Sequence, residues 1–165
     1  MRQNQLFSSR QFGFISGRST TLQLLHVLEE WTKALDEGEE IDVIYTEFQK
    51  AFDSVPYQRL LSKLRSYGIT DQVLGRIKSF LLNRKQRVAV NGIVSKWKYV
   101  ISGVPQGNVL GPILFVIFIN DIMDGLATTS YFFADDMKIF KRICNVADQA
   151  TLQQDLDKIS DWTKI

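Results

Sequence analysis

Residues 131–140 read YFFADDMKIF, so two adjacent carboxylates stand between two apolar and aromatic runs. The flanks predict two short strands, 130–134 and 137–141, with Asp135 and Asp136 at the reversal between them. Only a turn lets both carboxylates reach one point, because successive strand residues point to opposite faces. Two carboxylates at such a short distance repel each other unless a cation neutralises their charge. Mg²⁺ is a cation that prefers oxygen ligands. An ordinary Asp-rich turn is the alternative interpretation.

A third carboxylate ends another predicted strand. Residues 41–48 read IDVIYTEF, which is rich enough in β-formers to predict a buried strand that ends at Glu47. If this strand neighbours the 130–141 hairpin in one sheet, Glu47 converges with Asp135 and Asp136, and the three can hold two divalent ions. Two such ions about 4 Å apart serve phosphoryl transfer, because they activate the attacking oxygen and stabilise the leaving oxygen.

The rest of the chain predicts helices and one more hairpin. The predicted helices cover 20–36, 53–67, 71–82, 109–123 and 147–163. Asn91-Gly92 predicts a hairpin over 86–101 whose loop is longer than two residues, and Ser19 begins the N-cap of the first helix. Without a repeat or linker, the pattern predicts one compact unit of mixed α and β structure. Two apolar stripes are expected to face the core: Leu24, Leu25, Leu28, Trp31 and Leu35 in the first helix, and Leu152, Leu156, Ile159 and Trp162 in the last.

Composition narrows the class of protein. At 165 residues the chain can be one domain with a real core, or a piece of a larger one. Cys144 is the single cysteine, which excludes an internal disulfide, and the single histidine, His26, reads as a helix-surface or packing residue rather than a ligand. The longest apolar run, 109–119, is too short to span a bilayer, and residues 1–5 lack an apolar secretion signal. We expect an intracellular protein, nuclear or cytoplasmic, with no membrane partner.

Positive charge is concentrated in the middle of the chain. The net charge is only +2. Between Arg59 and Lys98 there are ten basic residues and one acid, Asp71, which makes that segment +9. Such clustering, with Trp97 and Tyr99 nearby, favours contact with the phosphates of a nucleic acid. A solvated helix face that carries these charges without function is the alternative.

The loop at residues 102–108, SGVPQGN, is dense in turn formers. Gly103 and Gly107 let the backbone approach a substrate closely, and the Gln106 amide can hydrogen-bond a base or a sugar. The loop can equally be a lead-in to the helix that follows. Phe52, just beyond the strand that ends at Glu47, can pack on a nucleotide sugar or fill core.

Several of these stretches resemble a known family. Residues 41–55 (IDVIYTEFQKAFDSV), 102–112 (SGVPQGNVLGP) and 133–140 (FADDMKIF) resemble the successive palm motifs of a reverse transcriptase, with most likeness to non-LTR (LINE-like) retrotransposons. Residues 11–21 and 77–91 are also similar to that family. The resemblance implies an RNA-directed DNA polymerase, a nucleotidyltransferase of α+β class. Its fold would be a polymerase palm, a ferredoxin-like antiparallel sheet with helices packed on one face.

The resemblance also implies roles for the residues near the carboxylates. Asp135 would be the principal metal-binding carboxylate, with Asp136 as its neighbour and Glu47 as the acid of the first strand. Phe48 would offer its backbone carbonyl to a metal ion. Phe52 would sense the sugar 2′ group, so that deoxynucleotides are favoured. The expected cofactor is a pair of Mg²⁺ ions, with Mn²⁺ as an alternative.

Further residues would bind the substrates that the resemblance implies, namely an RNA template, a DNA primer and deoxynucleoside triphosphates. Pro105, Gln106 and Gly107 would line the incoming nucleotide and the template base. The basic segment would follow the template–primer phosphates. Its expected nucleic-acid contacts are Arg84, Lys85 and Arg87.

The sequence also departs from the family pattern. Glu47 stands where the family has aspartate, and its extra methylene moves the oxygens by roughly 1 Å, which can cost about a hundredfold in rate. Asn108 replaces a usual serine and Met137 a usual threonine. We interpret residues 1–165 as a partial reverse transcriptase domain, part fingers and part palm, with incomplete fingers and no thumb. A degenerate polymerase, a non-catalytic nucleic-acid-binding remnant and an inert retrotransposon-derived fragment are the three hypotheses.

Overall fold

The computed structural model describes residues 6–164, so residues 1–5, to which the expectation about secretion applies, lie outside the described residues. The described residues form two compact units rather than the single unit expected. The first unit combines the chain up to Gln49 with the chain from Ile119 onward, and the second runs from Lys50 to Phe118. No helix within residues 6–164 has the length and apolar character needed to cross a membrane.

The first unit is built on a three-stranded antiparallel sheet. Its strands are β1 (Glu40–Thr46), β6 (Thr129–Phe133) and β7 (Asp136–Ile143), in the order β1-β7-β6. The expectation that the first strand joins the carboxylate hairpin in one sheet is therefore confirmed. The expectation that this strand is buried is wrong, because β1 is an edge strand paired on one side only and its Tyr45 side chain is 63% exposed.

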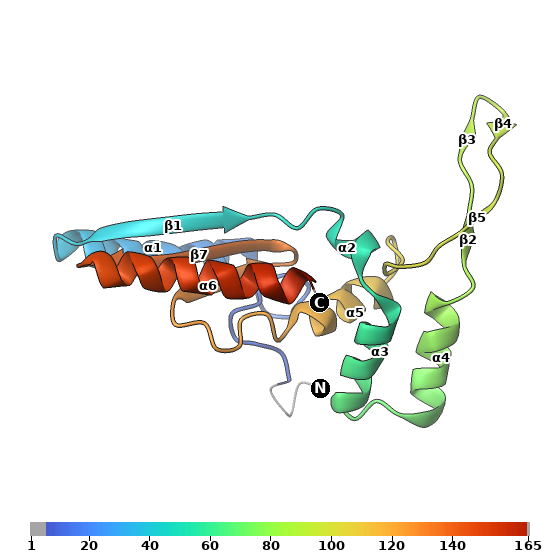
Figure 1. Ribbon diagram of the computed structural model, residues 1–165, viewed down its shortest axis with the longest axis horizontal. Coiled ribbons are helices and arrows are strands. Elements are labelled where there is room, and N and C mark those ends of the chain that lie inside the picture. Colours follow the sequence, from blue (N-terminus) through green and yellow to red (C-terminus); the bar gives the residue numbers. More distant parts are fainter. Residues whose placement is uncertain (1–5, 165) are drawn as a thin grey trace. The chain divides into compact units, whose positions relative to one another are not determined.

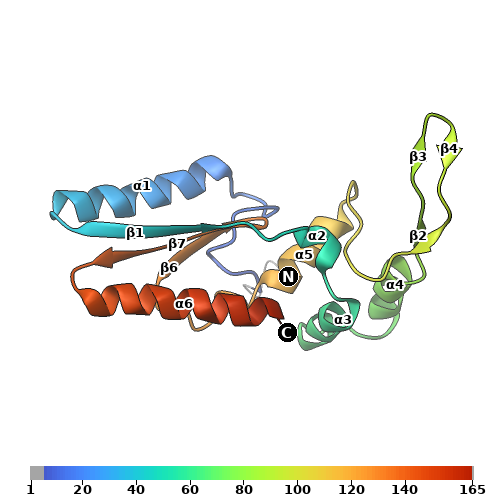
Figure 2. The ribbon, with the colours of Figure 1, turned by 45° about the horizontal axis from the view of Figure 1, so that its top comes forward.

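Two helices pack against this sheet, α1 (Thr20–Asp36) and α6 (Val146–Lys164). Figure 2 shows them on opposite faces of the sheet, with the strands between them. On the α1 face the rings of Trp31 and Phe140 meet edge to face, with centroids 5.9 Å apart. This arrangement differs from the expected sheet with helices on one face, because α1 covers the second face instead of lying at the side.

The predicted bounds of α1 are confirmed, but its predicted buried stripe is wrong. Ser19 caps the helix, since its hydroxyl accepts a hydrogen bond from the Leu22 N–H at 3.1 Å. The buried residues of the helix are Gln23, Val27 and Ala34, whereas the leucines of the predicted stripe are exposed. Of the predicted stripe, Trp31 does face the sheet, where its ring meets that of Phe140.

The second unit begins with three helices, α2 (Ala51–Ser54), α3 (Tyr57–Ser66) and α4 (Asp71–Leu81). The single helix predicted over 53–67 is interrupted at Val55, because a proline at the next position disfavours helical backbone. A fourth helix, α5 (Leu110–Ile119), ends before the predicted residue 123. Its side chains are buried from Leu114 onward, as expected for a helix that is apolar nearly all round.

A long hairpin leads from α4 to the loop before α5 (Figure 1). Its tip pairs β3 (Ala89–Val90) with β4 (Ile93–Val94), and its base pairs β2 (Lys85–Gln86) with β5 (Lys98–Tyr99). Asn91 and Gly92 have φ values of 48° and 80°, the left-handed pair that a type I′ turn requires. The loop is therefore two residues long, and the prediction of a longer loop is wrong.

Candidate active site

The strand that leads to Glu47 is hydrogen-bonded to the strand that Asp136 begins. The antiparallel ladder of β1 and β7 ends with Thr46 opposite Met137. Glu47 follows Thr46 in the chain, and Asp136 precedes Met137, so each acid adjoins this last pair. The two acids therefore come from sequence-distant segments to the same end of one sheet.

Ala134 and Asp135 form the two-residue turn between β6 and β7. Phe133 pairs with Asp136 across the turn, so Asp136 begins the strand and only Asp135 lies in the turn itself. Ala134 has a φ of 58°, a left-handed conformation that costs a residue with a side chain about 1–2 kcal/mol. The surrounding structure must hold this turn in place. Asp135 is half-buried and Asp136 is exposed.

The segment around Gln11 supplies that support. Gln11 and Phe132 form a parallel bridge beside β6, with Phe12 N–H donating to the Phe132 carbonyl at 2.8 Å. The Gln11 amide is buried and donates to the Ala134 carbonyl at 3.2 Å. Its oxygen accepts from the N–H groups of Gly13 at 2.7 Å and Ala134 at 3.1 Å. From the sequence, residues 11–21 were noted only for their similarity to the family.

Glycine is needed at position 13 for the same contact. A Cβ atom on Gly13 would collide with the backbone nitrogen of Ala134. Arg18 stabilises the segment, because its guanidinium donates hydrogen bonds to the backbone carbonyls of Ser8, at 2.7 Å, and of Gln11. The one sequence signal for this contact was a glycine between two phenylalanines, which indicates close packing but not its partner.

Two of the predicted carboxylates line one cavity of about 460 Å³ in the first unit. The cavity lies at the end of the sheet where β1 stops and β7 begins, beside the start of α1. Lys138 brings a positive charge to it and stacks over the Tyr45 ring at 5.8 Å. The lining residues are Thr20, Gln23, Tyr45, Thr46, Glu47, Phe133, Asp136, Met137 and Lys138.

The donor atoms at this cavity suit a hard cation, although they do not form a complete cage. Carboxylate oxygens are the ligands that Mg²⁺ prefers. Glu47 and Asp136 both line the cavity, whereas Asp135, one residue away in the turn, does not. Within residues 6–164 no group of three or more His, Cys, Asp or Glu side chains is placed to hold a metal ion. Two of the three predicted carboxylates thus share a cavity, and the third adjoins it in the chain.

Phe48 continues β1 beyond Glu47 and anchors the chain there. Its ring stacks on Phe132 of β6 with centroids 6.3 Å apart and an interplanar angle of 10°. The side chain therefore packs inside the unit. The predicted metal contact of Phe48 is made by its backbone carbonyl oxygen, not by this side chain.

Of the residues predicted to bind the nucleotide, Phe48 belongs to the first unit, and Phe52, Pro105, Gln106 and Gly107 belong to the second. The loop 102–108 binds tightly to α2, because the N–H groups of Gly103 and Val104 donate to the carbonyls of Val55 and Phe52 at 2.9 and 2.8 Å. Gln106 and Gly107 stay exposed, and Pro105 is half-buried. The structure thus brings Phe52 together with the loop that contains the other three residues.

Phe52 and Asn108 each have a clear local contact. The Phe52 ring stacks on Phe115 of α5 at 4.2 Å and remains half-exposed, so it both fills core and keeps accessible surface. Asn108 accepts from the Gly111 N–H and donates to the Pro105 carbonyl, both at 2.8 Å. The asparagine therefore ties the loop to the first turn of α5, in a position where the family usually has serine.

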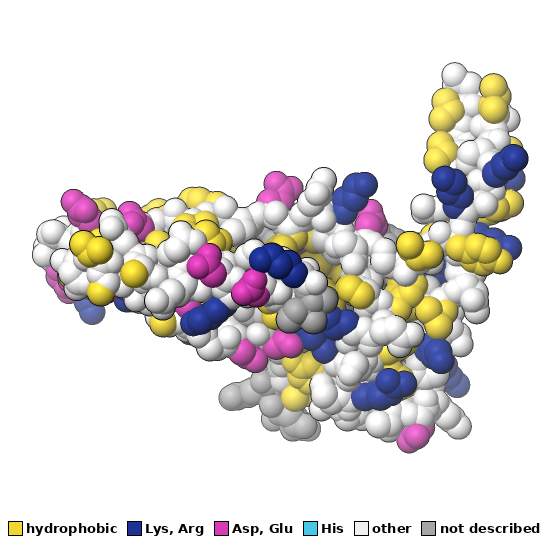
Figure 3. Space-filling view, viewed as in Figure 1, with side chains coloured by type: hydrophobic (Ala, Val, Ile, Leu, Met, Phe, Trp, Pro, Cys, Tyr) yellow, Lys and Arg dark blue, Asp and Glu magenta, His cyan; other side chains and the backbone are white. Residues whose placement is uncertain are grey.

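The basic residues predicted to contact nucleic acid differ in whether their side chains are bonded to other parts of the second unit. The Arg84 guanidinium donates to the Tyr57 hydroxyl at 2.8 Å and the Gly103 carbonyl at 2.6 Å, so it joins the hairpin base to the loop. Lys85 and Arg87 are exposed and lie over the rings of Tyr99 and Trp97, at 4.7 and 4.6 Å. Figure 3 shows basic and apolar side chains together on this hairpin.

Comparison with known proteins agrees with the resemblance noted in the motifs. Residues 1–164 match the family described as reverse transcriptase (RNA-dependent DNA polymerase). The RNA-directed DNA polymerase from mobile element jockey of Drosophila funebris is 35% identical over 161 residues, which are 92% of this chain. The polymerase assigned to transposon BS of Drosophila melanogaster is 30% identical over 174 residues, 99% of this chain.

A third relative is the Pol polyprotein from type-1 retrotransposable element R2 of Popillia japonica, which is 30% identical over 107 residues, 64% of this chain. The relatives are polymerases of non-LTR retrotransposons, as the motifs predicted. The chain spans only 18% of the jockey protein and 19% of the BS protein.

Proposed function

The chain belongs to the reverse transcriptase (RNA-dependent DNA polymerase) family of non-LTR retrotransposons, and from this premise we propose that its carboxylate turn serves RNA-directed DNA synthesis. The observation that supports the proposal most is the meeting of Glu47 and Asp136 at one cavity, beside the turn that contains Asp135. These acids come from two of the three stretches that resemble the palm motifs.

In this proposal Glu47, Asp135 and Asp136 bind two Mg²⁺ or Mn²⁺ ions together with the substrate. Protein sites for Mg²⁺ usually contain one or two carboxylates, and substrate phosphates and water complete the coordination. Glu47 and Asp136 would hold an ion at the cavity, and Asp135 and the Phe48 carbonyl are the further groups proposed to bind metal. Bound ions of this kind stabilise the charge on transferring phosphoryl groups.

Considered by itself, the second unit contains four of the residues that we propose to contact a nucleotide. The half-exposed Phe52 ring would face the sugar, where its bulk selects against a 2′-hydroxyl group. The exposed amide of Gln106 and backbone of Gly107, next to Pro105, would meet the base. Two backbone hydrogen bonds, from Gly103 and Val104, join this loop to the segment that contains Phe52, so the groups proposed for sugar and base are linked locally.

Glu47 limits this activity, in our proposal, because its longer side chain displaces the carboxylate oxygens. Primer extension on an RNA template, with Mg²⁺ or Mn²⁺, tests this. Glu47→Asp is expected to extend the primer faster than the natural chain by up to about a hundredfold. Glu47→Asp combined with Asp136→Asn is the matched control and should lose the gain. Absence of extension by Glu47→Asp would contradict any latent polymerase function.

A second candidate function is the binding of nucleic acid without catalysis. The observation that favours it is the exposed pair of cation–aromatic contacts on the hairpin, Lys85 with Tyr99 and Arg87 with Trp97. Cations of this kind neutralise phosphates, and aromatic rings stack on bases. An RNA–DNA duplex is the expected ligand.

A salt titration of binding, followed by fluorescence anisotropy of a labelled RNA–DNA duplex, tests this candidate. Lys85→Gln with Arg87→Gln should lower the slope of log affinity against log salt by about two. Lys164→Gln, which removes an exposed lysine in α6 outside the basic segment, is the matched control and should leave the slope unchanged. An affinity that does not vary with salt contradicts phosphate contact.

A further inference from the structure

The turn that contains Asp135 is held by a side chain that belongs to neither β6 nor β7. Three hydrogen bonds join the Gln11 amide to this region: one from its nitrogen to the Ala134 carbonyl, and two to its oxygen from the N–H groups of Gly13 and Ala134. The side chain is only 1% exposed. The nitrogen and the oxygen of its amide thus both have partners, and its main partner is the backbone just before the two acids.

An amide is well suited to this place. Ala134 presents a donor and an acceptor, and only a side chain with both a donor and an acceptor can bond both. Ala134 also has a left-handed φ of 58°. Alanine does not favour this conformation, so the surrounding structure must impose it. Gly13 lies so close to Ala134 that no larger residue fits, so the turn is confined by backbone on that side as well.

We propose that Gln11 is a positioning residue, which fixes the Ala134–Asp135 turn and thereby aims the carboxylates of Asp135 and Asp136 at a divalent cation. The inference rests on the cation site proposed above. Groups that orient metal ligands through hydrogen bonds typically change metal affinity by about 10- to 100-fold when they are removed. Gln11 acts through the backbone of the turn and does not itself touch the ion.

Two readouts test the role of Gln11 without requiring catalysis. The first is Mn²⁺ affinity, measured from the electron paramagnetic resonance signal of the free ion. Gln11→Met keeps the length of the side chain but removes all three hydrogen bonds, and should weaken Mn²⁺ binding by at least about tenfold. Gly13→Ala pushes on the same turn while the Gln11 side chain itself is kept, and it should weaken binding as well.

The matched control is Thr128→Val, which removes a buried hydrogen bond in the same unit, between Thr128 and Asp155. It should lower stability yet leave Mn²⁺ affinity unchanged, which separates positioning from a general structural role. The second readout is amide hydrogen exchange. In Gln11→Met the Ala134 amide should exchange at least about tenfold faster, while the Ile139 amide in the middle of β7 keeps its rate.

The outcomes separate the positioning role of Gln11 from the existence of the cation site. Mn²⁺ affinity that Gln11→Met leaves unchanged overturns the positioning role, as does an equal loss in Thr128→Val. If the natural chain binds no Mn²⁺, the proposed cation site fails, and exchange at Ala134 then decides for Gln11 alone. Faster exchange confined to the turn supports its hold on the turn, and unchanged exchange overturns it. If Gln11→Met does not fold, the same comparisons are made with Gln11→Glu, which has the same shape and loses only the donor to the Ala134 carbonyl.

Discussion

Asp155 has no exposed surface, although it is charged and lies on a helix that sequence analysis expected to be polar outside its leucine stripe. Its carboxylate accepts hydrogen bonds from the backbone N–H and the hydroxyl of Thr128 at 2.8 and 2.9 Å, and from the ammonium group of Lys158 at 2.8 Å. These bonds tie α6 to the residue before β6. Because its hydrogen bonds are satisfied inside the first unit, this buried carboxylate stabilises the fold of that unit.

Asp155→Ala should lower the free energy of unfolding by about 2 to 3 kcal/mol, because the Thr128 N–H and hydroxyl would be left buried without partners. Urea denaturation measures the change. Asp157→Ala is the control, since Asp157 is exposed and accepts a hydrogen bond from the side chain of Gln153, and it should change stability by less than about 0.5 kcal/mol. Equal effects from the two substitutions contradict the role assigned to Asp155.

The same carboxylate predicts a loss of stability in acid. Burial by itself raises the pKa of Asp155, but the hydrogen bonds from Lys158 and Thr128 outweigh it and hold the pKa below its ordinary value of 3.8. The group therefore stabilises the fold fully above that value, and the contribution is lost as pH falls through the lower, folded-state pKa. Urea midpoints measured from neutral pH down to acid should fall more steeply for the natural chain than for Asp155→Asn. Parallel curves contradict the assignment.

Sequence reasoning at the residue scale identified the acids but missed the groups that hold them. Asp135, Asp136 and Glu47 stand out because carboxylates beside apolar strands are unusual and follow family motifs. Gln11 and Asp155 do not stand out, because a polar residue has no local signature of burial. Their partners, Ala134 and Thr128, lie far away in the chain.

At the scale of elements, strands and helices followed the sequence where local chemistry defines an end. Ser19 caps α1, and the left-handed Gly68, with a φ of 78°, follows the end of α3. The predictions were wrong for two features that depend on packing, namely the buried face of α1 and the end of α5. The buried face of α1 is determined by which residues fit the sheet, and the end of α5 at Ile119 is not marked by any stop signal.

Two glycines predict opposite effects of adding a methyl group. Gly75 lies within α4, and an added Cβ meets no atom within 4 Å, so Gly75→Ala should stabilise the protein by about 0.5 to 1 kcal/mol. Gly103 has a φ of 87°, and an added Cβ would lie 2.6 Å from the Asp53 carbonyl oxygen. Gly103→Ala should therefore destabilise. Thermal unfolding compares the two, and shifts of the same sign contradict the packing of the loop against α2.

At the scale of the whole molecule, the chain is divided in a way that the sequence did not reveal. The strand before Gln49 pairs with one that begins at Asp136, so the first unit is made of two separated stretches. Such pairing depends on contacts between distant residues, which local patterns do not encode. Charge follows the same division, because the basic segment 59–98 lies entirely in the second unit.

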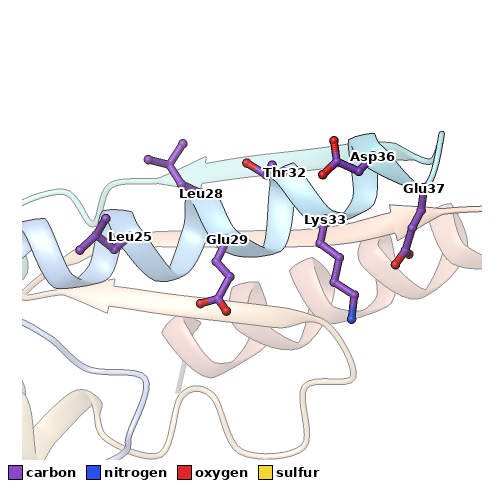
Figure 4. A pocket seen from close by; sticks show the side chains of 7 residues that line it. All are labelled: Leu25, Leu28, Glu29, Thr32, Lys33, Asp36 and Glu37. Carbon is purple, nitrogen blue, oxygen red and sulfur yellow. The ribbon is translucent and has the colours of Figure 1, made fainter.

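The first unit also exposes an apolar surface on α1. Leu25 and Leu28 are 57% and 55% exposed, and they line an open depression together with Glu29, Lys33 and their neighbours (Figure 4). Leu25→Gln with Leu28→Gln should reduce self-association in sedimentation velocity, since exposed apolar patches promote it, and should leave the melting temperature nearly unchanged. Val27→Gln, on the buried side of the same helix, should unfold the protein. A lower melting temperature in the leucine variant contradicts the exposure of this face.

We propose above all that acids from two distant stretches of the chain bind divalent cations together. The most direct test of this proposal is a Mn²⁺ titration of the natural chain, Glu47→Gln, and the double variant Asp135→Asn with Asp136→Asn, with Asp157→Asn as an exposed control. The account predicts measurable binding by the natural chain and by the control, and weaker binding by both site variants. Equal Mn²⁺ affinity in all four proteins, or none in the natural chain, would contradict it.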